Sequence, residues 1–163
     1  MFDRTHYVPI LKGRDGEYGA LTCLLPESRD RITPLLELPP IPWDFETEAP
    51  AKTIDQHLSK VGQKIERAWG LGRRLFIDLL WIAEAERMED GSHPIEFVFN
   101  TARSRGLAAL PVVGLLRGEE YLAACAGMLR KDRRGACLRI QREDFVDFTD
   151  LGPLLRNSEG ACR

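Results

Sequence analysis

The chain lacks the sequence features that mark membrane, secreted and zinc-binding proteins. No apolar run approaches the ~20 residues that a membrane-spanning helix needs, and residues 1–6 lack the basic-then-apolar pattern of a signal peptide. The four cysteines show no CxxC spacing, which disfavours both a zinc site and a disulfide framework. We therefore expect a cytoplasmic protein that does not contact the membrane.

A strong excess of charge of one sign is also lacking. The formal net charge is −2, and 44% of the 163 residues are hydrophobic, which is typical of a single globular domain with a buried core. The one basic cluster lies at 130–134, where its simplest role is to complement the negative end of a helix. Nucleic acid is therefore not an expected partner.

Short apolar runs alternate with amphipathic stretches, which predicts an α/β fold of parallel βα repeats, about (βα)4β. The domain should occupy 1–147 and a C-terminal tail 148–163. Eight such repeats close a barrel, so the pattern predicts a TIM-barrel-like half or truncated barrel with two open edge strands. The predicted strands are 7–11, 32–38, 75–82, 107–116 and 136–141, and the predicted helices are 17–25, 54–68, 94–105 and 118–131.

Charged side chains interrupt or close several of the apolar strands. Lys12 and Glu37 end the first two strands, Asp78 lies in the third, and Arg139 lies in the fifth. Because the carboxyl ends of parallel strands meet at one edge of the sheet, we expect these four side chains to form a single polar site. Such a site has two interpretations, a functional pocket or an internal salt-bridge cluster. Unpaired buried charges cost several kcal/mol each, which favours function slightly.

Specific roles follow if the site is functional. Glu37 and Asp78 would serve as catalytic carboxylates together with Lys12, or as metal ligands for a divalent cation such as Mg²⁺. Arg139 would bind an anionic ligand through paired hydrogen bonds.

Two residues of the loops that follow the second and third strands are further candidates for ligand binding. Trp43 lies in the proline-rich segment 39–50 and either stacks on a base or sugar or anchors a rigid lid. His93 precedes Pro94 at a predicted helix start and either reaches the site or caps the helix.

Six motifs follow one another along the chain: YVPILKGRDGE at 7–17, TPLLELP at 33–39, FID at 76–78, DGSHP at 90–94, LPVVG at 110–114 and CLR at 137–139. This ordered series resembles the beta protein family of phage and bacterial genomes. The resemblance covers about residues 5–145. It implies a TIM-barrel-like protein about twice this length, of which this chain corresponds to the N-terminal half, and it implies no particular reaction. Members of the family often occur near phage or defence genes.

Two functions therefore stand as hypotheses. The first is a domain that binds a phosphorylated or anionic small molecule or a nucleotide at the carboxyl ends of the strands. This hypothesis includes the case in which the domain also catalyses a reaction of that ligand. The second is a protein-interaction component of a phage-encoded or anti-phage defence system, whose open strand edges are covered by a partner or by another copy in a homo-oligomer. The sequence favours neither an enzyme nor a pure binding protein, and a divalent cation is the one cofactor that it suggests.

Overall fold

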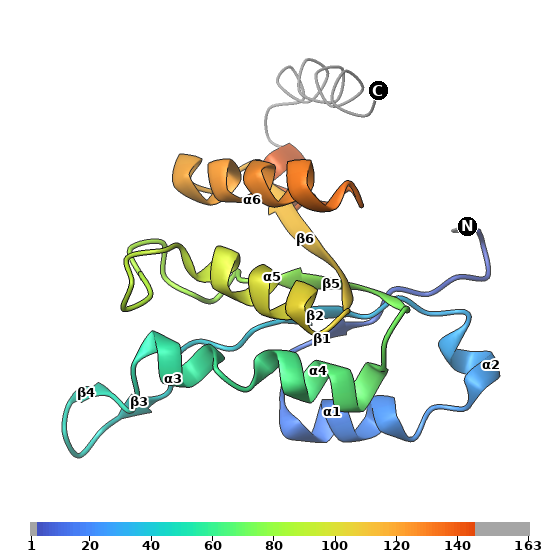
Figure 1. Cartoon of the computed structure of the whole chain (residues 1–163), viewed down its shortest axis with the longest axis horizontal. Coiled ribbons are helices and arrows are strands. Elements are labelled where there is room, and N and C mark those ends of the chain that lie inside the picture. The colour runs from blue at the N-terminus through green and yellow to red at the C-terminus, as the bar shows by residue number, and fades with distance from the viewer. Residues whose placement is uncertain (1–2, 146–163) are drawn as a thin grey trace.

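The computed structural model describes residues 3–145, which form a curled parallel sheet with helices along one face (Figure 1). The strand order is β1-β2-β5-β6-β7, and every neighbouring pair is parallel. The predicted α/β half-barrel of parallel βα repeats is confirmed. The strands are β1 (Ile10–Leu11), β2 (Leu35–Glu37), β5 (Arg74–Asp78), β6 (Ala108–Gly114) and β7 (Cys137–Arg139).

The helices lie in the crossovers between consecutive strands of this sheet. Between β1 and β2 lie α1 (Asp15–Thr22) and α2 (Pro26–Arg29); between β2 and β5 lie α3 (Ile54–Leu58) and α4 (Val61–Trp69). The later crossovers contain α5 (Pro94–Ser104) and α6 (Glu119–Asp132), and a short 3-10 helix, η1 (Arg142–Phe145), follows β7. The predicted tail at 148–163 lies outside the described residues.

Several predicted boundaries were wrong for identifiable reasons. The helix predicted at 54–68 is two helices, because the Ser59 hydroxyl donates to the carbonyl of Gln56 at 2.9 Å and competes with the helical hydrogen bonds. The first two strands are shorter than predicted, since Pro9 and Pro34 lack the N–H that a strand ladder uses. The proline-rich loop contains a small antiparallel hairpin of β3 (Trp43–Asp44) and β4 (Ala49–Pro50).

The two faces of the main sheet bury different sets of side chains, because successive residues of a strand point to opposite faces. Leu36 and Ile77 point towards the helices and belong to the main hydrophobic core. Leu35, Phe76 and Leu110 are paired in register and belong to a second cluster on the inner face, away from the helices. Two residues further along β2 and β5, the same inner face carries charged side chains instead of apolar ones.

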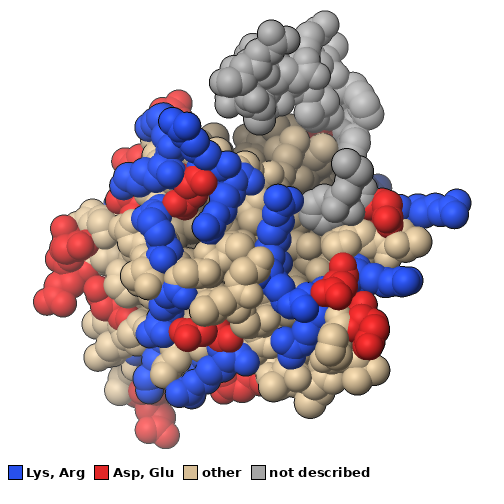
Figure 2. Space-filling model, turned by 45° about the vertical axis from the view of Figure 1, so that its right-hand side comes forward, with Lys and Arg blue, Asp and Glu red and all other residues tan. Residues whose placement is uncertain are grey.

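Charged side chains are distributed unevenly between the two ends of the strands. The first turns of α1, α5 and α6 contain acidic residues, and the last turns of α4, α5 and α6 contain basic ones. Lys and Arg accordingly gather on the side that Figure 2 brings forward, where the strands begin. Within residues 3–145, no helix is both long and apolar enough to cross a bilayer.

Candidate functional site

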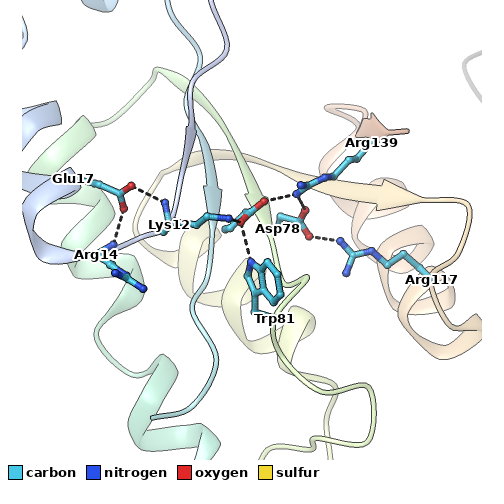
Figure 3. A network of polar contacts seen from close by, with 8 residues as sticks. Lys12, Arg14, Glu17, Asp78, Trp81, Arg117 and Arg139 are labelled. Carbon is cyan, nitrogen blue, oxygen red and sulfur yellow. Dashed lines mark hydrogen bonds and ion pairs between the residues drawn. The ribbon is translucent and has the colours of Figure 1, made fainter. Parts of the chain in front are cut away.

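The structure brings Lys12, Glu37, Asp78 and Arg139 together on the inner face, at the carboxyl ends of the strands (Figure 3). Glu37 and Asp78 are register partners on the adjacent strands β2 and β5. Arg139 ends β7 and reaches back across β6 to both carboxylates, with its Nη1 2.5 Å from Glu37 Oε1 and 2.9 Å from Asp78 Oδ2. One guanidinium nitrogen therefore bridges the two acids.

Every carboxylate oxygen of this pair accepts a hydrogen bond. Glu37 Oε2 accepts from Lys12 Nζ and, at 2.8 Å, from the indole Nε1 of Trp81. Asp78 Oδ1 accepts from Arg117, which lies between β6 and α6. We call these six side chains the charge network: Lys12, Glu37, Asp78, Trp81, Arg117 and Arg139.

The acids of the charge network are more deeply buried than its bases. Glu37 and Asp78 have no exposed surface, whereas 50% of the Lys12 side chain and 23% of the Arg139 side chain are exposed. Burial alone raises the pKa of Glu37, but the hydrogen bonds from Lys12, Trp81 and Arg139 outweigh it and lower that pKa to about 2. The network contains two acids, Glu37 and Asp78, and three bases, Lys12, Arg117 and Arg139. With all five ionised, it carries one net positive charge.

A glycine sets the turn that brings Lys12 into the network. Gly13 follows Lys12 directly and has a φ of 63°, in the left-handed region that glycine tolerates without strain. A Cβ atom at this position would lie 3.0 Å from the backbone oxygen of Glu37. A side chain at residue 13 would thus push apart the strand ends that carry Lys12 and Glu37.

Trp81 and Arg117 were not among the residues predicted from the sequence. Arg117 contacts Asp78 and places its guanidinium 5.1 Å from the ring centre of Tyr121. Its sequence signal matches that of the predicted residues, a charge just beyond an apolar strand. The ring of Trp81 lies under the Lys12 ammonium, 5.2 Å from the ring centre, and this contact depends on a loop path that no sequence pattern reveals.

The structure does not bring Trp43 or His93 into the charge network. Trp43 lies in the β3–β4 hairpin and is 53% exposed. His93 caps α5, since its Nδ1 accepts a hydrogen bond from the N–H of Ile95 at 3.2 Å. Of the two roles expected for His93, this contact is the helix cap. Burial lowers the pKa of His93, and the nearby Arg87 lowers it further, which favours the neutral ring that such a cap requires.

A pocket of about 150 Å³ lies beside the charge network. Its wall includes His93, Arg117 and Tyr121, together with apolar side chains from the segment after β5. Arg117 belongs to both the pocket wall and the network. A ligand in this pocket would therefore touch a cation that also contacts Asp78.

Comparison with known proteins identifies the family. The model of the family described as "Beta protein" matches residues 7–157. The chain belongs to the Beta protein family. The match includes every residue of the charge network, so this site lies within the part of the chain that characterises the family. No curated protein and no solved structure matched the chain.

The contacts of Glu37 and Asp78 disfavour a metal ion between them in this member of the Beta protein family. An incoming Mg²⁺ would have to displace Lys12, Arg117 or Arg139 from an oxygen atom that each already occupies. Within residues 3–145, no group of three or more His, Cys, Asp or Glu side chains is placed to hold a metal. Magnesium binding by Glu37 and Asp78 stays a prediction from the sequence.

Proposed function

We propose that this Beta protein family chain binds an anionic small molecule, a phosphorylated compound or a nucleotide, at the carboxyl ends of its strands. The supporting observation is the excess of cations in the charge network. An ammonium has three N–H donors and a guanidinium has five, and the two carboxylates contact one nitrogen each of Lys12, Arg117 and Arg139. The remaining N–H groups can bind phosphate or carboxylate oxygens.

The acidic pair serves to position the cations in this proposal. A carboxyl group with a pKa of about 2, as for Glu37, stays ionised at neutral pH and is a weak proton acceptor. This property favours binding over proton transfer as the role of the site. Catalysis by Glu37, Asp78 and Lys12 stays a prediction from the sequence.

The surroundings of the charge network suit a ligand with both an anionic and an apolar part. Trp81 is 49% exposed and presents a ring face next to Lys12. The adjoining pocket combines Arg117 and His93 with apolar walls and with Glu84, whose carboxylate accepts from the N–H of Gly118 at 2.8 Å. A phosphate or carboxylate would contact Lys12 and Arg139, while a ring would stack on Trp81 or enter the pocket.

A thermal-shift experiment tests the proposal. Inorganic phosphate, pyrophosphate and nucleoside phosphates should raise the melting temperature of the wild type, and Lys12→Met should lose most of that increase because it removes an exposed cation of the site. Lys64→Met is the matched control. Lys64 also pairs with one carboxylate, at 2.5 Å, also lies over a ring, that of Tyr18, and has a side chain 44% exposed.

The two variants separate ligand binding from loss of an ion pair. If the proposal is right, Lys64→Met keeps the anion-dependent increase in melting temperature. An increase of equal size in Lys12→Met, or none in the wild type with any of these anions, would contradict it.

A second candidate function rests on the two edge strands of the sheet. Within residues 3–145, β1 and β7 have no neighbouring strand on their outer sides. They also carry exposed apolar side chains, with Ile10 53% and Leu138 41% exposed. Such edges pair readily with another chain. We propose that a protein partner or a second copy covers them, in a cytoplasmic protein of a phage-encoded or anti-phage defence system.

The mass of the protein in solution tests this second candidate for the case of a second copy. Light scattering should give a mass above that of one chain, and an Ile10→Lys substitution should reduce it to one chain, because a charge on an edge strand opposes pairing. Leu25→Lys is the control, since Leu25 is 67% exposed and lies outside the sheet. A monomeric wild type, or equal effects of the two substitutions, would argue against pairing between copies.

A further inference from the structure

A cluster of exposed cations lies at the opposite ends of the strands from the charge network. The cations at this surface come from the segments just before β2 and β7, from the first residue of β5, and from the last turns of α4 and α6. None of these cations has an ion-pair partner among residues 3–145. We call them the basic rim: Arg31, Arg67, Arg74, Arg130, Lys131 and Arg133.

Ion pairs connect the neighbouring segments from which the cations of the rim come. Asp30 before β2 pairs with Arg73 before β5 at 2.5 Å. Glu66 of α4 pairs with Arg105 after α5 at 2.7 Å. At the next junction, Arg103 of α5 pairs with Asp132 of α6, also at 2.7 Å. Asp30, Glu66 and Asp132 are thus already paired with other arginines, and the cations of the rim are additional to those pairs (Figure 2). Glu27 of α2 is an exposed acid at the same end.

Helix dipoles account for only part of this cluster. Arg67, Arg130 and Lys131 lie in the last turns of α4 and α6, where a cation complements the negative end of the helix. Arg31 and Arg74 lie outside the helices: Arg31 precedes β2, and Arg74 is the first residue of β5. The net charge of −2 conceals this concentration, because acidic residues gather at the other ends of the strands.

We propose that the basic rim binds the phosphate backbone of double-stranded nucleic acid without reading its bases. Cations spread over several loops match a row of phosphates, and such contacts carry no sequence information. Binding of single strands usually relies on aromatic side chains that stack on bases. Among the described residues, the exposed Trp43, Phe45 and Trp81 belong to segments after β2 and β5, at the other ends of the strands. Tyr7, whose N–H donates to the carbonyl of Arg31 at 2.9 Å, is the one exposed aromatic side chain at the rim end among residues 3–145, and a single ring offers little stacking surface for a strand of several bases.

This inference departs from the expectation drawn from the sequence, where 130–134 was the one visible basic cluster. In the sequence, Arg31, Arg67 and Arg74 lie far from residues 130–134, and only the fold places them at the same end of the sheet as that cluster. The rim is also separate from the charge network, so the inference does not depend on the proposed anion site.

Fluorescence anisotropy with a short labelled DNA duplex tests the inference on the full chain. If four to six cations contact phosphates, the logarithm of the association constant should fall against the logarithm of salt concentration with a slope of roughly −4 to −5. A triple variant, Arg67→Gln, Arg74→Gln and Arg130→Gln, should bind about 10- to 100-fold more weakly and bring the slope closer to zero by about 3.

A second triple variant removes the same charge from the other end of the strands. Arg14→Gln, Lys52→Gln and Lys60→Gln replace cations in the segments before α1, α3 and α4, and duplex binding should stay within about twofold of the wild type. Thermal unfolding confirms that each variant is folded. The single Arg74→Gln variant, at an exposed side chain, should still bind about threefold more weakly if the triple variant does not fold.

Several results would overturn the inference. They are the absence of duplex binding at low salt, equal losses in the two triple variants, and a salt slope near zero. Tighter binding to single strands than to the duplex would overturn the assignment to double-stranded nucleic acid. Binding to heparin without binding to DNA would show that the rim recognises a different polyanion.

Discussion

Replacing Arg139 with methionine should lower the free energy of unfolding by about 3 to 5 kcal/mol, which is the usual effect of breaking a buried ion pair. Arg139 Nη1 contacts both carboxylates of the charge network. Without it, Glu37 keeps Lys12 and Trp81 and Asp78 keeps only Arg117 among these contacts. Two fully buried acids on adjacent strands would then face each other without the cation between them.

Urea denaturation measures this effect, and a surface pair provides the control. Arg105→Met breaks the pair with Glu66, in which both side chains are more than a third exposed, and should lower the free energy of unfolding by less than about 1 kcal/mol. Adding Glu37→Gln to Arg139→Met should recover part of the loss, because it removes an uncompensated buried charge. If Arg139→Met destabilises no more than Arg105→Met, the charge network contributes little to stability.

The stability of the protein should depend on pH through Glu37. The pKa of about 2 in the folded protein lies below the ordinary value of 4.5, so the unfolded chain binds a proton at higher pH than the folded chain does. The stabilisation by ionised Glu37 is therefore complete above about pH 4.5 and is lost as the pH falls towards about 2. The difference between the two pKa values corresponds to about 3 kcal/mol.

The Glu37→Gln variant isolates this contribution from that of the other acids. Its free energy of unfolding should fall less steeply than that of the wild type between about pH 5 and pH 2, so the difference between the two proteins should shrink in acid. Glu66→Gln is the control at a partly exposed acid, and its difference from the wild type should change little over this range. Parallel curves for the wild type and Glu37→Gln would show that Glu37 is not held ionised by the network.

The sheet and most of the charge network could be predicted because they follow from short-range patterns and one topological rule. Apolar runs separated by amphipathic stretches indicate parallel strands, and parallel strands bring their carboxyl ends to one edge. This rule placed Arg139 next to Glu37 across 102 residues of sequence. It applies equally to Arg117, which follows the strand predicted at 107–116 as directly as Lys12 follows the strand predicted at 7–11, so the same rule could have included it.

Features that depend on the path of a loop could not be predicted in this way. Trp81 donates to Glu37 only because the segment after β5 turns back over β2, and its sequence shows an ordinary aromatic residue. The break between α3 and α4 depends on one hydroxyl, that of Ser59, within an otherwise regular helical pattern. The basic rim depends on three-dimensional placement alone, since cations as distant in sequence as Arg31 and Arg133 contribute to it.

Isothermal titration of the purified protein with phosphate, pyrophosphate and nucleoside phosphates tests most directly whether the charge network is an anion site. We expect saturable binding of at least one of these anions to the wild type and to Lys64→Met. We also expect binding about 10- to 100-fold weaker to Lys12→Met, as for the loss of a charge-assisted hydrogen bond. Equal affinities of the wild type and Lys12→Met, or no binding of any of these anions, would contradict the proposed function and leave the network as a structural cluster.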